Sequence, residues 1–277
     1  MGELTNASTC VPVMLSEYFR TCSNLSSNFI AIALSINLVL GLPPNCYILW
    51  LTMKEMIQGQ STKTFVFSTA LVEIFFCASY VFVIPQHFYK CIKCELGVLF
   101  LGLVLLIGRP LFQSCICVER YIGVLHPVTF LKFKPMKYRI VISITGWILT
   151  ICLCILVSVN VIGLYNLLLP GFLFFFSIKL FTCLMVLKAL LRPGPGDDIK
   201  KRNGVNRDKL KAFWIIVMVL VSSVLTYGPS TISLVLYYFI DWERFLWSWS
   251  ISMCLGLMSG FVQPILYLKR VGKLPFC

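Results

Sequence analysis

Residues 108–127 read GRPLFQSCICVERYIGVLHP and place two arginines in one apolar segment. Arg109 stands inside a run long enough to cross a lipid bilayer, and Arg120 follows Glu119 near the end of that run. Eleven positions at about 100° per residue bring both arginines onto one helix face, roughly 16 Å apart. The segment therefore predicts a membrane helix with one charge at mid-bilayer depth and another at its end.

The composition indicates a membrane protein built from helices. Hydrophobic residues make up 58% of the 277 positions and charged residues only 13%, unlike an ordinary soluble domain. A helix needs about 20 apolar residues to cross a hydrocarbon core of roughly 30 Å, and such runs recur along the chain. We predict an all-α bundle of seven transmembrane helices at about residues 29–53, 64–86, 96–121, 140–162, 167–191, 212–240 and 245–268.

The remaining segments are read as tails and loops around one membrane domain, residues 29–268. We predict an N-terminal tail over 1–28, a loop over 192–211 and a C-terminal tail over 269–277. The first 20 residues are too polar for a cleaved signal peptide, so the first helix is expected to act as the anchor. Most of the 24 lysines and arginines fall on one side, which predicts the N-terminus outside and the C-terminus inside. The net charge of +13 then serves topology and contact with membrane lipids, and no nucleic-acid partner is expected.

The tails carry candidate modification sites. Two sequons, at Asn6 and Asn24, predict glycosylation outside the cell. Cys277 follows several basic residues and is a candidate for acylation. One or two disulfides are expected outside, with three connectivities open, and no cofactor or metal is expected because no second ligand pair accompanies the outer cysteines. These disulfide candidates are Cys10, Cys22, Cys91 and Cys94.

Short motifs follow one another along the predicted helices. In chain order they are Asn45 in GLPPN, Glu73, the triplet Glu119-Arg120-Tyr121 with His126-Pro127, Trp147, Pro229, and Gln263-Pro264 with Tyr267. Through this ordered set the chain resembles the rhodopsin class (class A) of G-protein-coupled receptors. The resemblance spans all seven predicted helices and rests on the order of the motifs rather than on any one of them.

The resemblance implies a plasma-membrane receptor. Such a receptor binds an extracellular or membrane-derived ligand and activates a heterotrimeric G protein through the inner ends of its third, sixth and seventh helices. The positions implied in coupling are Glu119, Arg120, Tyr121, Pro127, Lys209 and Tyr267. The helix switch positions are Asn45, Trp147, Tyr227, Pro229, Gln263 and Pro264. An enzyme is not expected, because no nucleophile with a base and no paired carboxylates share one depth.

Arg109 requires a partner, because a lone arginine at mid-bilayer costs about 2.5–3.5 kcal/mol on insertion scales. Glu73 lies ten residues, roughly 15 Å, beyond Lys63 at the mouth of the second helix, and so has nearly the same depth. The resemblance implies a sodium site formed by the helix-two acid and a small polar residue in the place of Arg109. We expect Arg109 to fill that site as a built-in cation, and a Glu73→Arg/Arg109→Glu swap to restore expression. A purely structural salt bridge is the alternative.

The ligand class is narrowed by exclusion. Gly102 stands where amine receptors have an aspartate, and Leu257 stands where opsins have a lysine. No basic residue occupies the places used by nucleotide receptors. The predicted cavity is apolar, which favours a hydrophobic or lipid-like ligand, with a peptide as the alternative. Its candidate lining residues are Gly102, Leu103, Thr231, Leu234 and Met253.

Several positions depart from the family pattern. Tyr227 replaces a tryptophan, Gln263 replaces an asparagine or aspartate, and Lys209 stands where Arg120 would find its acidic partner. The connection around residues 163–166 leaves no room for the usual long outer loop, so either the loop is short or the transcript lacks part of an exon. A non-signalling or decoy receptor, or a truncated splice form, is therefore an alternative. A transporter or channel is disfavoured, because no chain of acids continues from Glu73.

Overall fold

The computed structural model describes residues 24–58, 63–80, 82, 92–132, 135–159, 163–191 and 199–271. Within these ranges the chain is helical and contains no strand, so the all-α prediction is confirmed. The helices are α2 (Asn24–Ile57), α3 (Thr64–Ala78), α5 (Ile92–Leu125), α6 (Pro127–Lys132), α7 (Met136–Ser158), α8 (Leu164–Leu191), α9 (Ile199–Leu236) and α10 (Trp242–Val271).

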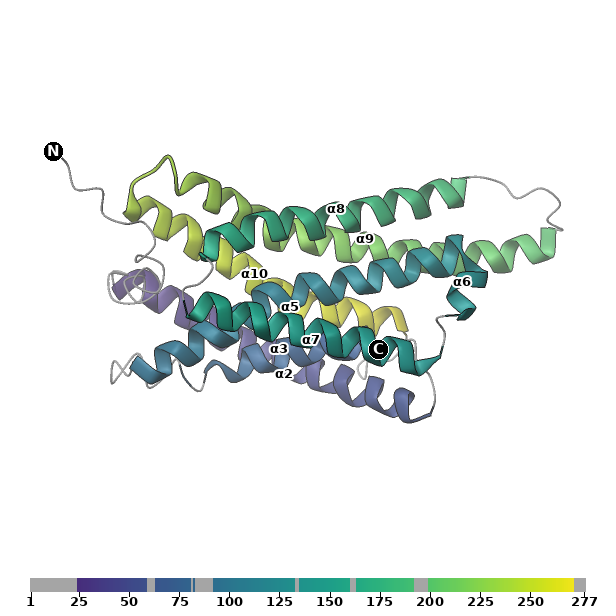
Figure 1. Ribbon diagram of the computed structural model, residues 1–277, viewed down its shortest axis with the longest axis horizontal. Coiled ribbons are helices and arrows are strands. Elements are labelled where there is room, and N and C mark those ends of the chain that lie inside the picture. The colour runs from purple at the N-terminus through teal and green to yellow at the C-terminus, as the bar shows by residue number, and fades with distance from the viewer. Residues whose placement is uncertain are drawn as a thin grey trace.

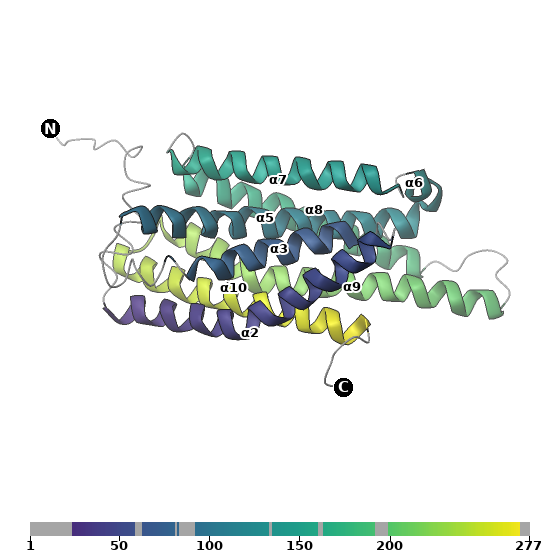
Figure 2. The same cartoon turned by 90° about the horizontal axis from the view of Figure 1, so that it is seen from below.

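The long helices pack side by side into one bundle with α5 at its centre (Figure 1). Helix α5 contacts α3, α7, α8 and α9, while α10 packs between α9 and α2, and α2 packs on α3. Figure 2 shows α7 on the outside of the bundle and the short α6 at its end. Most of the span Gly97–Leu125 in α5 is buried inside the bundle. Side chains of α5 are thus placed to meet those of several helices.

The outer surface of the bundle is suited to lipid. Among the described residues, five helical spans are long and apolar enough to cross a membrane, and α3 is a shorter apolar helix. Large apolar side chains such as Val39, Phe174 and Leu225 are more than half exposed, where a soluble protein would carry polar groups. A helix bonds its own backbone polar groups, which lipid cannot do. Helices with apolar outer faces are therefore stable in a bilayer.

Two helix boundaries differ from the prediction. Helix α3 ends at Ala78 rather than near 86, and the chain tightens there because Ser79 N donates to Phe76 O and Phe82 N donates to Ser79 O. Helix α9 begins at Ile199, within the predicted loop 192–211. Polarity suggested a loop, but this segment is rich in lysine and arginine, which are good helix formers. Helix α9 therefore extends beyond its apolar span.

Trp147 fixes the contact between α7 and α5. Its ring centroid lies 5.3 Å from that of Phe112 on α5 and 5.9 Å from that of Phe75 on α3. Gly146 allows the close approach, because a Cβ there would lie 3.0 Å from Leu111 Cδ2 and 3.1 Å from Phe112 Cε1. The motif tryptophan therefore packs at a helix crossing beside the buried face of α5.

Candidate functional site

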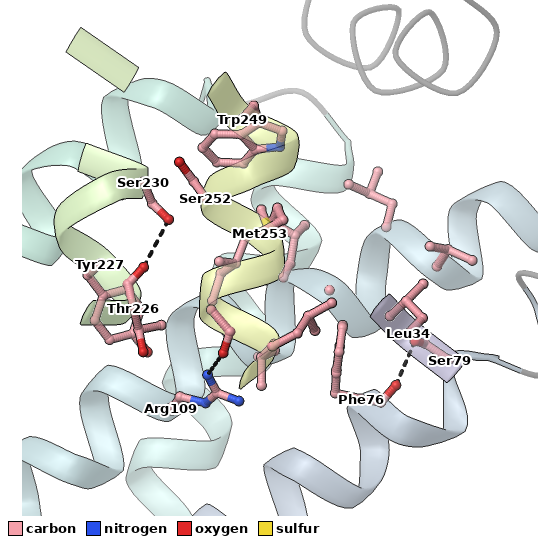
Figure 3. A pocket seen from close by; sticks show the side chains of 18 residues that line it. Leu34, Phe76, Ser79, Arg109, Thr226, Tyr227, Ser230, Trp249, Ser252 and Met253 are labelled. Atoms are coloured by element: carbon pink, nitrogen blue, oxygen red, sulfur yellow. Dashed lines mark hydrogen bonds between the residues drawn. The ribbon is translucent and has the colours of Figure 1, made fainter. Parts of the chain in front are cut away.

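Arg109 and Glu73 form a buried ion pair between α5 and α3. Arg109 Nε donates to Glu73 Oε1 and Arg109 Nη2 donates to Glu73 Oε2, a two-point contact that suits the planar guanidinium. The third nitrogen, Nη1, donates to the carbonyl of Gly256 on α10 at 3.1 Å (Figure 3). Arg109 is 2% exposed and Glu73 4% exposed. The structure thus brings together the two residues that the depth argument paired, and joins a third helix to them.

Gly260 on α10 leaves the space that the ion pair occupies. A Cβ at this position would lie 2.9 Å from Asn37 Oδ1, 3.1 Å from Glu73 Oε2 and 3.2 Å from Arg109 Nη2. All three distances are tighter than ordinary van der Waals contact. Any residue larger than glycine must therefore displace polar atoms of the pair or of Asn37.

Gly260→Ala is expected to lower the free energy of unfolding by about 1–3 kcal/mol, because overpacking of a close contact outweighs the better helix propensity of alanine. Thermal unfolding of the purified protein in detergent measures the effect. Gly102→Ala is the matched control, because a Cβ at Gly102 meets nothing within 4 Å. The control should gain up to about 1 kcal/mol. Equal shifts for the two variants would contradict the packing described here.

The motif residues of α2, α9 and α10 lie around this level. Asn45 Nδ2 donates to the carbonyls of Gly41 at 2.8 Å and of Gly260 at 3.0 Å, which ties α2 to α10. Pro229 lies inside α9 and Pro264 inside α10. Prolines free a backbone carbonyl in a helix, and membrane bundles re-satisfy such groups through neighbouring helices. The asparagine of GLPPN thus acts here as a link between helices.

Lys179 is a second buried cation, whose surroundings the sequence did not reveal. It lies on α8 with 1% exposure, and its Nζ donates to Gln113 Oε1 at 3.0 Å and to Ser223 Oγ at 2.9 Å. The ammonium also lies 5.4 Å from the ring centre of Tyr227. No carboxylate pairs with it in the described part of the chain. A lone lysine in an apolar run is the signal that could have singled it out.

At the other motif, Glu119 is directed away from Arg120. Its Oε1 lies 3.0 Å from Arg139 Nη1 on α7, and the Arg139 guanidinium lies 5.2 Å from the ring centre of Phe130. Arg120 Nε is buried and has no hydrogen-bond partner among the described residues. Tyr121 packs its ring against Phe181 of α8. The arginine of the triplet is therefore not held by its neighbouring glutamate.

An apolar cavity of about 140 Å³ lies between α2, α3, α5, α9 and α10, with Arg109 at one end (Figure 3). Of the predicted ligand residues, Gly102, Leu103 and Met253 line it. Thr231 and Leu234 do not, which corrects the prediction: Leu234 is buried in the hydrophobic core and Thr231 Oγ1 donates to the carbonyl of Tyr227. These two residues lie on the lining face of α9 but one turn farther along than its lining residues Tyr227 and Ser230.

The polar groups of this cavity are mostly engaged. Ser230 Oγ donates to the carbonyl of Thr226 at 3.1 Å, and Ser79 Oγ donates to the carbonyl of Phe76 at 2.6 Å (Figure 3). The Tyr227 hydroxyl is buried with no hydrogen-bond partner among the described residues. The cavity is similar in size to engineered apolar cavities of about 150 Å³ that stay dry and take up benzene or xenon. Its chemistry suits an apolar group.

Comparison with known proteins points to one class of membrane receptor. No family model matches the chain. It is 22% identical to proteinase-activated receptor 3 of Rattus norvegicus, over 88% of this chain and 73% of that receptor. It is 26% identical to purinoceptor 2 of Mus musculus, over 72% and 60% of the two chains, and 31% identical to purinoceptor 4 of Xenopus laevis, over 42% and 22%.

The chain is a homologue of rhodopsin-class G-protein-coupled receptors. The long helices therefore form the seven-helix bundle of that class, and the protein is a multi-pass protein of the plasma membrane. Its relatives are receptors rather than enzymes. The resemblance drawn from the ordered motifs is confirmed.

Some predicted positions of this receptor homologue lie outside the described residues. They are the whole of Asn6, Cys10, Cys22, Cys91 and Cys277, and the side chains of Asn24, Cys94, Lys209, Gln263 and Tyr267. Pro127 is described and begins the short helix α6. Glycosylation, disulfides and acylation stay predictions.

Proposed function

We propose that this protein is a receptor that activates a heterotrimeric G protein at the end of the bundle where Arg120 lies. The N-terminus would lie outside the cell and the Arg120 end inside, as the distribution of basic residues indicates. The observation that carries the proposal is the state of Arg120. Glu119 pairs with Arg139 at 3.0 Å, and Arg120 Nε has no hydrogen-bond partner among the described residues. The arginine is thereby available to a protein partner.

The ligand that this receptor binds is proposed to be hydrophobic. The relatives include purinoceptors and proteinase-activated receptors, but the cavity has one cationic side chain, Arg109, among its lining residues. That side chain is already bonded to Glu73 and to the Gly256 carbonyl. A phosphate-bearing ligand would find no unpaired cation in this lining, whereas an apolar ligand loses little by entering it.

The Glu73–Arg109 pair is proposed to hold α3, α5 and α10 together in place of a bound ion. The two-point contact fills the space beside the carboxylate, and the bond to Gly256 adds the third helix. Gly260 leaves no room for a larger side chain there. A fixed guanidinium would make the resting state of the bundle independent of the sodium concentration.

Arg120→Ala tests the coupling proposal. In cells exposed to serum or lipid extract, the wild type is expected to raise G-protein activation, and Arg120→Ala to reduce the response to background at equal surface expression. Lys137→Ala is the control, because Lys137 is an exposed cation at the same end of the bundle, at the beginning of α7. An equal response from wild type and Arg120→Ala would refute coupling through this arginine. No response from any variant would favour a decoy receptor.

A further inference from the structure

Two apolar cavities meet at Leu257 on α10. The first is the inner cavity that ends at Arg109. The second, of about 280 Å³, is lined by residues of α2 and α10 alone. Leu257 lines both, and on α2 the adjacent residues Ala33 and Leu34 line the second and the first respectively. A single layer of side chains therefore separates the two cavities.

The second cavity faces the surroundings of the bundle. Its lining is hydrophobic throughout, and several members are strongly exposed, among them Ile32 at 60%, Ile251 at 51% and Met258 at 48%. In a plasma-membrane protein, exposed apolar side chains on spanning helices contact lipid tails. A molecule that enters this cavity from the bilayer crosses no polar surface, so the cavity selects for apolar molecules.

Leu257 separates the cavities by its side chain alone. It is 5% exposed, and its backbone lies within regular α10. A leucine side chain can change rotamer without breaking a backbone hydrogen bond, whereas a passage through the helix itself could not open so simply. Displacement of this one side chain would connect the membrane-facing cavity with the inner cavity.

We propose that apolar ligands enter the inner cavity from the bilayer, between α2 and α10 and past Leu257. This inference rests on the proposed hydrophobic ligand and adds its route. An amphiphile concentrates in the membrane in proportion to its buried CH₂ groups. A lateral passage takes the ligand from that reservoir without returning it to water. Ala33 and Ile36 of α2 are the places where a bulky side chain would close the route.

The test uses the full chain in lipid nanodiscs with a long-chain fatty alcohol that carries an aliphatic diazirine. Photolysis at increasing times after mixing, followed by mass spectrometry, gives the rate at which residues 98–106 of the inner cavity are labelled. Ala33→Trp should slow this labelling at least tenfold and leave the final level unchanged. Leu257→Ala should accelerate it severalfold. Ala78→Trp, an exposed position that lines neither cavity, should match the wild type.

The outcomes separate the route from the ligand class. Labelling of Ala33→Trp at the wild-type rate, with the final level also unchanged, would overturn the lateral route and leave the hydrophobic ligand standing. Absence of labelling in the wild type at all times would overturn the ligand class and the route with it. If Ala33→Trp unfolds at a lower temperature than the wild type, Ile36→Trp closes the same cavity from the next turn. A wild-type rate for Leu257→Ala would likewise refute the gate.

Discussion

Arg109→Met alone is expected to lower the free energy of unfolding by about 3–5 kcal/mol and to remove most of the protein from the cell surface. The variant leaves the Glu73 carboxylate buried without its two-point donor. Glu73→Leu should act in the same direction, because Arg109 would lose both carboxylate acceptors while it keeps the Gly256 carbonyl. Thermal unfolding in detergent and surface immunolabelling measure both effects.

The double variant Glu73→Leu/Arg109→Met is expected to recover most of the loss. Replacing both members of a buried ion pair by apolar residues of similar volume is often neutral or stabilising, whereas breaking the pair is not. The charge swap Glu73→Arg/Arg109→Glu should recover less, because it removes the donor to Gly256.

The matched control for the ion pair is Lys63→Met. Lys63 Nζ lies 3.8 Å from Glu55 Oε2 in a partly exposed pair, which should contribute less than about 1 kcal/mol. A double variant as unstable as either single variant would contradict the pairing of Glu73 with Arg109. A control as damaging as Arg109→Met would show that the losses do not depend on burial.

Lys179→Met is expected to raise the free energy of unfolding by about 2 kcal/mol. A lysine near the bilayer centre costs about 2.5–3.5 kcal/mol on insertion scales, and part of that gain is offset by the two lost hydrogen bonds. Gln113 Oε1 keeps a donor after the change, because Ser223 Oγ lies 3.3 Å away. Thermal unfolding in detergent is the measurement.

Lys188→Met serves as the control for this change. Lys188 lies on the same helix, α8, in its last turn and is exposed, so the same substitution should leave the stability unchanged within about 0.5 kcal/mol. A loss for Lys179→Met as large as that for Arg109→Met would mean that Lys179 neutralises a buried acid.

The sequence predicted the Glu73–Arg109 contact because helix rise fixes the depth of a residue, and a charge at mid-bilayer needs a partner. The same reasoning missed the Glu119–Arg139 pair. Adjacent residues on a helix do not face each other, so Glu119 could not hold Arg120 and turned to α7 instead. Depth was predictable, whereas the helix that would supply the partner was not.

The ligand cavity was predicted one turn too far along α9, at Thr231 and Leu234. Membrane helices are apolar on most sides, so the hydrophobic pattern does not fix their rotation or vertical offset. For the same reason, Lys179 was visible as a lone charge while its partners on α5 and α9 were not. The beginning of α9 at Ile199 was missed because polarity predicts solvent contact and not the absence of a helix.

The sodium dependence of thermal unfolding tests most directly whether Arg109 is a built-in cation. The purified wild type is compared in sodium chloride and in choline chloride at equal ionic strength, and Arg109→Ser serves as the variant that reopens the ion site. The expected result is one unfolding temperature for the wild type in both salts and a higher temperature in sodium for Arg109→Ser. A sodium-specific rise in the wild type would contradict the built-in cation.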